Sequence, residues 1–340
     1  MRVVVADPPA FTPPYDHELA AALARAGADV ELVTSRFRFG AVPEPDGYRR
    51  RELFYPLSSR LFRRSRLRLP LKAAEHPLGL LRLAALDPDV VHLQWLAWPQ
   101  LDARLLRLRA PSVFTAHDLL PRRTAGKTTL WRRLLLRFDR VVVHSERGRE
   151  ALAELGVDAR VIPHPVFRRD LTPNADGTAL FFGVIRPYRG LDDAVAAARR
   201  AGARLIVAGD PVMPVQRVEG VDYRLGYLSE DEVDRAHAEA TVAVFPYRPE
   251  LDQSGSLLRA LGSGVPAVVY DVGGLAEPVE RYGAGLVVPA GDVEALGDAL
   301  RRVLEDPEPF RAGAERARAE LTWDAAAAAH LALYEELSRS

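Results

Sequence analysis

Short runs rich in valine and isoleucine alternate along the chain with longer stretches whose apolar residues recur every three to four positions. Continuously apolar short runs are typical of parallel strands covered on both faces, and the longer stretches predict the helices that cover them. The predicted strands are Val3–Ala6, Val30–Thr34, Val90–Leu93, Ser112–Thr115, Val141–His144, Arg160–Ile162, Ala179–Phe182, Leu205–Ala208, Asp222–Leu225, Val242–Phe245, Ala267–Tyr270 and Gly285–Val288. The predicted helices are 16–26, 71–86, 100–108, 128–137, 146–155, 190–201, 230–239, 255–262, 292–304 and 308–320.

The alternation of strands and helices restarts after a polar stretch at residues 167–177, FRRDLTPNADG, which we interpret as a linker. At 340 residues the chain is long for a single hydrophobic core, so two domains are expected. The sequence therefore predicts an α/β protein with two doubly wound, Rossmann-like domains, at 1–168 and 169–321, that face one another across a cleft. In such sheets, ligands bind beyond the carboxyl ends of the strands.

The composition excludes several classes of protein. The chain has no cysteine, which rules out disulfides, thiolate nucleophiles and cysteine-bound metals. No apolar run approaches the roughly 18 residues that a membrane span needs. The N-terminus, MRVVVADPP, is too short and too early broken for a signal peptide. We therefore expect a cytoplasmic protein.

The formal net charge of zero conceals an uneven distribution. Residues 1–170 hold 29 Arg and Lys against 19 Asp and Glu, and the rest of the chain is acidic to the same extent. Residues 49–72 mix arginine with Leu, Phe and Tyr, which suits peripheral contact with an anionic membrane or an anionic substrate. An arginine-rich solvated loop and helix face explains this segment equally well. Nucleic acid is not an expected partner, because the acidic half would repel it and no nucleic-acid-binding motif is present.

Polar side chains follow the predicted strands of the first domain. They are Asp7, His92, Gln94, Trp95, His117, Asp118, His144, Ser145 and His164. A single histidine at such a place is more often a hydrogen-bonded structural residue than a catalyst. No pair has the i, i+4 spacing of a helical metal site, so no metal is expected. The turn after the first strand, ADPPAFTPPYD, has no glycine, which disfavours a dinucleotide there and favours a nucleotide in the second domain.

The most informative segment is 247–277, which reads YRPELDQSGSLLRALGSGVPAVVYDVGGLAE. Its polar turn, residues 252–255, precedes a predicted helix whose free N–H groups and positive dipole end suit a phosphate. An ordinary strand–turn–helix is the alternative. Upstream, FFGVIRPYRG carries Arg186 and Arg189, two guanidiniums that could clamp a diphosphate. The segment RLGYLS at 224–229 predicts a strand end, a glycine turn and a serine N-cap beside the same cleft.

At these residues the chain resembles the retaining glycosyltransferases of family 4, also called group-1 glycosyltransferases, which have the two-domain GT-B fold. The resemblance covers essentially the whole length. It is carried by the order and spacing of PPYDHELAAALARAGADVELVTS, TAHD, VVHSERG, VIPHPV, FFGVIRPYRG, LIVAGD, GYLSEDEV, VFPYR, SGSLLRALGSGVPAVVYDVGG and GLVVPAGDVEAL. The tail at 322–340 is similar to the family's C-terminal helix, which packs back on the first domain.

The resemblance implies transfer of a sugar from a nucleoside-diphosphate sugar to an acceptor hydroxyl with retention of configuration, without a metal ion or other cofactor. It implies that Arg186 and Arg189 neutralise the leaving diphosphate and that His117 points at the transferred sugar. The implied donor-binding residues are Asp252, Gln253, Ser254, Gly255, Ser256, Tyr227, Gly274 and Glu277. The acceptor, a glycan, glycolipid or small molecule, is expected near Tyr15, Gln94 and Asp118.

The chain also departs from the family pattern. The two glutamates that the family usually carries eight positions apart are replaced by Leu251 and Arg259, and Val184 stands where an arginine is usual. The chain instead resembles a variant branch with a QSG turn. Candidates for contact with the sugar in this branch are Glu250, Asp252 and Gln253.

These departures motivate two alternatives to an active transferase. One is a protein of the same fold that binds a nucleotide sugar without turning it over, as a partner or regulatory subunit. The retained arginines, His117 and the QSG turn argue against it. The other is a sugar-nucleotide epimerase of the same fold, which would need a pair of catalytic acids that the sequence does not identify.

Overall fold

The computed structural model describes residues 1–61, 68–119, 126–248 and 253–339. The contacts within the chain divide it into two compact units. Unit 1 is Met1–Pro163 together with Trp323–Ser340, and unit 2 is His164–Thr322. The division thus lies at 163/164, whereas the boundary predicted from the sequence lies at 168/169, and the C-terminal tail groups with unit 1.

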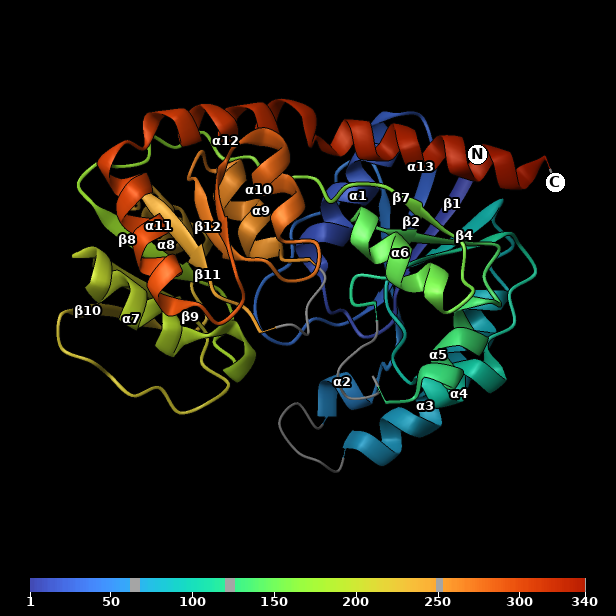
Figure 1. Cartoon of the computed structure of the whole chain (residues 1–340). Coiled ribbons are helices and arrows are strands. Elements are labelled where there is room, and N and C mark those ends of the chain that lie inside the picture. The colour runs from blue at the N-terminus through green and yellow to red at the C-terminus, as the bar shows by residue number, and fades with distance from the viewer. Residues whose placement is uncertain (62–67, 120–125, 249–252, 340) are drawn as a thin grey trace. The chain divides into compact units, whose positions relative to one another are not determined.

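Unit 1 contains one parallel sheet of seven strands (Figure 1). They are β1 (Arg2–Asp7), β2 (Asp29–Ser35), β3 (Arg49–Phe54), β4 (Val90–Leu93), β5 (Ser112–Thr115), β6 (Arg140–Val143) and β7 (Ala159–Val161). The order is β3-β2-β1-β4-β5-β6-β7, so the strand order reverses between β1 and β4. Ligands of doubly wound sheets bind at such a reversal, outside the carboxyl ends of the strands.

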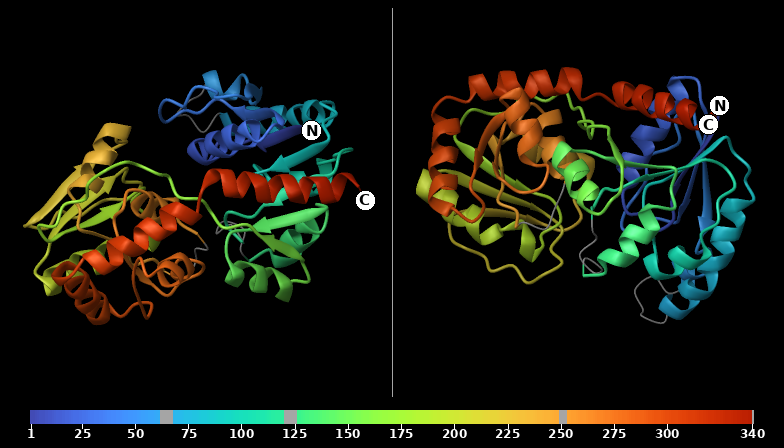
Figure 2. Two further views of the ribbon diagram at one scale, coloured as in Figure 1. Left: turned by 90° about the horizontal axis from the view of Figure 1, so that it is seen from above. Right: turned by 45° about the vertical axis from the view of Figure 1, so that its right-hand side comes forward.

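The helices of unit 1 connect these strands. They are α1 (Pro13–Arg25), α2 (Ser58–Leu61), α3 (Arg68–Ala84), α4 (Pro99–Leu105), α5 (Thr128–Leu135), α6 (Glu146–Glu154) and the C-terminal α13 (Trp323–Ser338). Helix α13 packs against α1 (Figures 1 and 2). Its Tyr334 hydroxyl lies 2.6 Å from Nδ1 of buried His92, which anchors the tail in the core of unit 1.

Unit 2 contains a parallel sheet of six strands. They are β8 (Thr178–Phe182), β9 (Arg204–Gly209), β10 (Val221–Leu225), β11 (Val242–Phe245), β12 (Ala267–Tyr270) and β13 (Gly285–Val288), in the order β10-β9-β8-β11-β12-β13. Its helices are α7 (Leu191–Ala201), α8 (Glu230–Ala238), α9 (Gly255–Gly262), α10 (Ala276–Tyr282), α11 (Val293–Glu305) and α12 (Glu308–Glu320), with the 3-10 turn η2 (Pro187–Arg189) before α7. The order of the strands reverses between β8 and β11.

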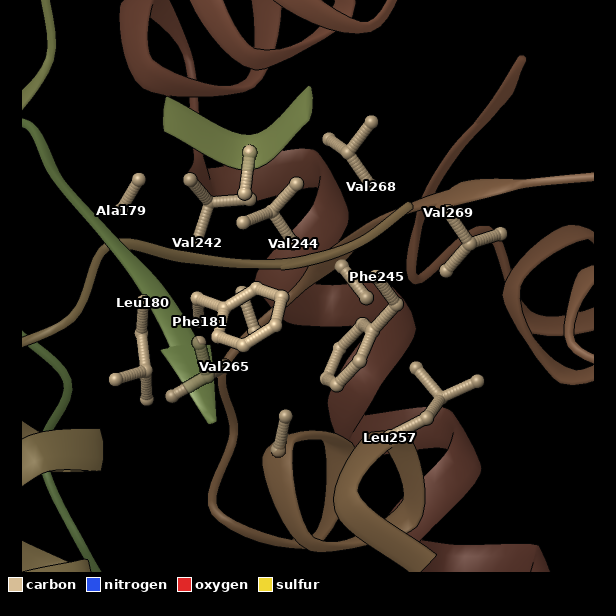
Figure 3. Close-up of a cluster of buried hydrophobic side chains, with 14 of the residues drawn as sticks. Ala179, Leu180, Phe181, Val242, Val244, Phe245, Leu257, Val265, Val268 and Val269 are labelled. Atoms are coloured by element: carbon tan, nitrogen blue, oxygen red, sulfur yellow. The ribbon is translucent and has the colours of Figure 1, made fainter. Parts of the chain in front are cut away.

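The core of unit 2 is built from both faces of its sheet. Side chains of β8, β11 and β12 interdigitate with Leu257 of α9 and with Val265 (Figure 3). Phe181 and Phe245 are almost completely buried, and burial of such side chains stabilises a fold by about 1.5–3 kcal/mol each. The continuously apolar strands predicted this double coverage, and the predicted two-domain α/β architecture is confirmed.

Three elements of the segments 49–72 and 247–277 were not predicted: strand β3, the short helix α2 and helix α10. Residues 49–54 form the edge strand β3 rather than a solvated loop or helix face. The run RRRELF lacks the apolar signal of a buried strand, because β3 pairs with β2 alone and its arginines stay at the surface. Helix α10 was not expected after the Gly273–Gly274 turn; Pro278 lies in its first turn, where its missing N–H breaks no helical bond.

The basic segment 49–72 is partly neutralised within unit 1. Arg49 pairs with Asp29 at 2.9 Å, and Arg51 pairs with the buried carboxylate of Glu31 at 2.7 Å. Residues 62–67 of this segment lie outside the described residues. Within the described ranges, no helix has the length and apolar character needed to cross a bilayer.

Candidate functional site

Arg189 lies where the strand order of unit 2 reverses. Its Nη1 donates to the carbonyl oxygen of Phe182, at the end of β8, at 3.2 Å and to Ser256 Oγ at 3.0 Å. Its guanidinium also stacks on the ring of Tyr247, 5.0 Å from the centroid. Arg189 therefore joins the ends of β8 and β11 to the first turn of α9, and its charge is fixed at the place where the sheet predicts a ligand.

Two glycines allow this arrangement. A Cβ on Gly183, which has a φ of +120°, would lie 2.4 Å from Arg189 Nη1 and 2.5 Å from Ser256 Oγ. A Cβ on Gly190, with a φ of +69°, would lie 2.0 Å from the carbonyl oxygen of Pro246. Both positions combine a left-handed backbone with a close approach, so the pattern FFGVIRPYRG is required to bring Arg189 over the strand ends.

The N-terminus of α9 faces the same place. Ser254 is its N-cap, with Oγ accepting from the N–H of Leu257 at 3.3 Å and lying 3.1 Å from the hydroxyl of buried Tyr247. The N–H groups of Gly255 and Ser256 have no acceptor within the helix, and the helix dipole is positive there. Together with Arg189 they form a cationic cradle of the kind that binds phosphate.

Gly255 is not required by the packing of the protein. A Cβ there would meet only Phe167 Cε2, at an ordinary contact distance of 3.8 Å. The absence of a side chain instead leaves open the approach to the first amides of α9, which fits the role predicted for this residue.

The QSG turn is tied to the glycine-rich loop after β12. Gln253 Nε2 donates to the carbonyl oxygen of Gly274 at 3.2 Å, so the structure brings these two predicted donor-binding residues together. Glu277 follows in the first turn of α10 and is half-buried. Asp252, together with Glu250 and Leu251, lies outside the described residues.

Among the described residues, the side chains of two predicted donor-site residues make no hydrogen bond or ion pair to this cradle. The side chain of Arg186 is exposed and makes no hydrogen bond or ion pair among the residues that the structure describes, so its role as the second cation of the clamp stays a prediction. Tyr227 is 58% exposed after the edge strand β10. Burial, followed by the charge of Glu230, raises the pKa of its hydroxyl, which places Tyr227 beside the start of α8. Ser229 is the N-cap of that helix, as predicted, and it forms a capping box with Glu232.

Arg259 is held by carboxylates from α8. Its Nη2 donates to Glu230 Oε2 and to Asp234 Oδ1, each at 2.8 Å. Burial alone would raise the pKa of Glu230, but the hydrogen bond and charge of Arg259 lower it. An ionised acceptor is therefore present beside the position where the family usually has its second glutamate. The pairing of Arg259 with Glu230 and Asp234 was not predicted from the sequence, although the run SEDEV at residues 229–233 is acidic.

His117 lies at the carboxyl edge of the sheet in unit 1 and is positioned by His144. His144 Nδ1 lies 2.9 Å from the carbonyl oxygen of Ile162, which can only accept, so Nδ1 carries the proton. Burial lowers the pKa of His144 to about 4, so its Nε2 is a bare acceptor at neutral pH. His117 Nδ1, at 3.2 Å, must therefore donate to it, and the tautomer of His117 is fixed on that side.

Two residues predicted on the acceptor side, Tyr15 and Gln94, also contact His117. The side-chain amide of buried Gln94 lies 2.9 Å from His117 Nε2, and because the ring proton of His117 is on Nδ1, the NH2 of this amide must be the donor. Buried Tyr15 packs its ring edge-on against His117, with ring centroids 4.6 Å apart. Trp95 stacks on the imidazole ring of His117, with ring centroids 5.2 Å apart. Tyr15 and Gln94 thus lie around His117 rather than at an open surface, and Asp118 follows His117 half-buried. Their acceptor contacts stay a prediction.

The other strand-end histidines have structural partners. His92 is fully buried, with Nδ1 on Tyr334 and Nε2 2.7 Å from Thr115 Oγ1, and burial holds its pKa well below the usual value. His164 is buried with Nδ1 2.6 Å from the carbonyl oxygen of Pro165. Outside the gaps at 62–67, 120–125 and 249–252 and residue 340, no group of three or more His, Asp or Glu could hold a metal ion. Metal independence stays a prediction.

Comparison with known proteins identifies the family. Residues 15–167 match the model of Glycosyltransferase Family 4, and residues 176–306 match that of Glycosyl transferases group 1. The chain belongs to the group-1 glycosyltransferases of family 4. The predicted family is confirmed, and the protein is a transferase enzyme.

The known relatives of this glycosyltransferase act on different sugars. The chain is 26% identical over 286 residues to the GDP-mannose-dependent alpha-mannosyltransferase of Mycobacterium tuberculosis. The aligned region covers 74% of this chain and 75% of the relative. The chain is also 29% identical over 271 residues to the 2-deoxystreptamine glucosyltransferase of Streptomyces kanamyceticus, covering 73% and 70%. The fold matches that of sucrose-phosphate synthase from Thermosynechococcus elongatus with a TM-score of 0.77 at 21% identity, over 99% of both chains. The GT-B fold is thereby confirmed.

Proposed function

We propose that this glycosyltransferase moves a sugar from a nucleoside-diphosphate sugar to an acceptor hydroxyl with retention of configuration and without a metal ion. The observation that carries the proposal is the cradle at the strand-order reversal of unit 2. There Arg189 is held 3.0 Å from Ser256, beside the free amides of α9. A diphosphate needs both features, since the amides bind one phosphate group and the guanidinium neutralises charge on the other.

The reaction breaks the bond between the anomeric carbon and the diphosphate oxygen and forms a bond from the acceptor oxygen on the same face. The acceptor's proton passes to an oxygen of the departing phosphate, so no side chain of the protein acts as base. The first turn of α9 holds the distal phosphate, and Arg189 stabilises the negative charge that grows on the leaving group. Unit 1 supplies His117, whose orientation is set by His144 and whose contact with the transferred sugar is implied by the family resemblance.

For the nucleoside, we infer that Glu230 takes the place of the missing second glutamate as acceptor for the ribose hydroxyls. Its Oε2 is engaged by Arg259, which orients the carboxylate and keeps it ionised. Arg259 itself has only donors and could not accept from the ribose. Exposed Tyr227 supports this inference, because its aromatic ring lies beside Glu230 and is open to a nucleoside.

The proposal extends to the acceptor and to the place of action. We infer a carbohydrate or lipid-linked acceptor used at the cytoplasmic face of a membrane, with peripheral contact through the basic segment 49–72. The internal pairing of Arg49 and Arg51 leaves a smaller net charge for this contact than the sequence alone suggests.

The reaction is tested with UDP-, GDP- and ADP-sugars. Release of nucleoside diphosphate is measured with carbohydrate and lipid acceptors, with and without EDTA, and the anomeric configuration of the product is read by NMR. We expect one donor class to be turned over equally with and without EDTA and to give a product with the donor's configuration. An inverted product, a loss of turnover in EDTA, or tight donor binding with no release in any acceptor mixture would contradict the proposal.

Gly255→Ala tests the phosphate cradle directly. Alanine in the first turn of α9 should leave stability unchanged or raise it by up to about 1 kcal/mol, since the new Cβ has room and alanine favours helix. The same methyl group would stand between the amides and a phosphate. We expect weaker binding of nucleoside diphosphate, by calorimetry, at an equal or higher melting temperature.

Gly202→Ala is the matched control for that substitution, because Gly202 ends α7 with open space around it but away from the cradle. It has a φ of +66°, so its alanine variant should be less stable while keeping its diphosphate affinity. Unchanged affinity in Gly255→Ala would remove the first turn of α9 from the donor site.

A further inference from the structure

A cavity of about 540 Å³ lies in unit 1, lined by residues 106–112, residues 137–139 and Leu337 of α13. Ser112 is the first residue of β5, and Asp139 directly precedes β6. The cavity is therefore at the amino-terminal edge of the sheet, opposite the edge that carries His117. Its volume is in the range of small-molecule sites, about 300–1,000 Å³.

Two guanidiniums converge at this cavity. Arg137 Nη2 donates to the carbonyl oxygen of Leu106 at 2.9 Å, and Arg107 Nη1 donates to the same oxygen at 3.0 Å. Arg137 Nη1 also donates to the carbonyl oxygen of Ala103, near the end of α4. Because one oxygen accepts from both side chains, the two positive groups are held close together, and a bound anion would offset their mutual repulsion.

The positive charge at the cavity is not balanced by acids. Arg109 also lines it, and among the residues that the structure describes no carboxylate forms an ion pair with Arg107, Arg109 or Arg137. The one acid in the lining is Asp139, and its Oδ2 accepts from the N–H and the hydroxyl of Ser112 at 2.7 and 2.8 Å. The cavity thus combines three guanidiniums with one engaged carboxylate.

Arginine is abundant in this chain, so an unpaired arginine needs comparison with others in the same protein. Arg149 pairs with Glu146 at 2.7 Å and Arg200 with Asp298 at 3.0 Å, both at exposed positions. Some surface arginines elsewhere in the fold thus have acidic neighbours, while others, such as Arg132 and Arg140, bond only to backbone carbonyls. The three arginines around the cavity have no ion pair among the described residues. Their gathering around one hollow is the feature that points to a ligand.

We propose that this cavity binds a small phosphorylated molecule, with Arg107 and Arg109 as its phosphate ligands and Arg137 fixed beside them. Guanidinium groups bind phosphate oxygens in pairs through parallel N–H donors. Leu106, Phe138 and Leu337 supply an apolar wall for the rest of the molecule. Since Leu337 belongs to α13, a bound ligand would also hold the end of this helix against the rest of unit 1. The inference does not depend on the proposed donor site.

The test is a calorimetric titration of the full chain with inorganic pyrophosphate at low salt. We compare the wild type with the double variant Arg107→Gln/Arg109→Gln, which keeps Arg137 and its bonds to α4. The expected result is one fewer bound pyrophosphate per chain in the double variant, at an unchanged circular dichroism spectrum. The variant Arg107→Lys/Arg109→Lys keeps the charge but loses the planar fork, and we expect about tenfold weaker binding at this site.

Arg104→Gln/Arg133→Gln is the matched control, since both arginines are exposed in unit 1 outside the cavity and the change in charge is the same. It should keep the wild-type stoichiometry. The same stoichiometry in the wild type and in Arg107→Gln/Arg109→Gln would overturn the proposal, and so would an equal loss in the control. If the glutamine variant does not fold, wild-type affinity in the lysine variant would overturn it as well.

Discussion

Arg189→Ala is expected to lower kcat by about 10²–10³, the usual cost of removing one preorganised donor from a developing negative charge. The guanidinium is placed by Phe182, Ser256 and Tyr247 before any ligand arrives, so the protein has already met the cost of ordering it. Its charge matters most as the diphosphate departs. Donor affinity should therefore fall less than kcat, because the amides of α9 still bind the ground state.

The comparison with Arg186 makes this prediction specific to the structure. The sequence places both arginines in the same motif, whereas the structure fixes the side chain of Arg189 and leaves the side chain of Arg186 exposed, without a hydrogen bond or ion pair among the described residues. Arg186→Ala should lower kcat by about tenfold or less, and Arg189→Lys should retain part of the activity. Steady-state kinetics with the preferred donor give both values. Equal losses for the two alanine variants, or an unchanged kcat for Arg189→Ala, would show that the charge is not used in the cradle.

Most of the fold could be predicted because the apolar pattern is local. Strands that are buried on both faces, such as β4, β5, β11 and β12, have the bounds that the sequence predicts. The edge strand β3 was missed because an edge strand needs no apolar face, and its arginines are balanced by Asp29 and Glu31 from the neighbouring strand. Those partners are close only after the sheet has formed.

The candidate site could be predicted in part for a similar reason. Ser254, Gly255 and Arg189 stand in short motifs whose backbone geometry is set locally, and the structure brings them together. Tyr247 beneath Arg189 and the carboxylates that hold Arg259 could not be identified, since they come from separate elements. The family pattern showed only that an arginine, Arg259, replaces the usual glutamate, which reverses the charge at this position. Only the packing of α8 on α9 shows that Glu230 and Asp234 restore acidic groups there.

Lowering the pH from 7 to 5 is expected to destabilise unit 1 strongly. Burial lowers the pKa of His144 and of His330 to about 4, and it holds the pKa of His92 well below its usual value. In the unfolded chain these groups have a pKa of about 6.5. The contribution of these neutral histidines to stability is complete above pH 6.5 and is lost as the pH falls toward 4. The reason is that the unfolded state binds protons in this range and the folded state does not. By pH 5, each histidine lowers the free energy of unfolding by about 2 kcal/mol.

A buried acid pair in the same unit acts in the opposite direction. Burial raises the pKa of Asp16, and the charge of Asp7 raises it further, so the folded state holds a proton that the unfolded state releases. This contribution grows as the pH falls through the folded pKa, and it offsets part of the loss from the histidines. Asp16→Asn, which mimics the protonated acid, should remove the offset and make the acid destabilisation of unit 1 steeper.

His330→Leu tests the contribution of a single histidine to this pH dependence of stability. His330 Nδ1 bonds only to the carbonyl oxygen of Ala326 in its own helix, and its buried Nε2 has no hydrogen-bond partner among the described residues, so leucine removes no tertiary hydrogen bond. All four tryptophans lie in unit 1, at 95, 98, 131 and 323, so tryptophan fluorescence in urea reports the unfolding of this unit alone. Between pH 7 and 5 the variant should lose about 2 kcal/mol less than the wild type. His17→Gln, at a half-buried position on α1, is the control and should keep the wild-type dependence. An equal pH dependence in wild type and His330→Leu would mean that His330 is not the source of a proton-linked loss.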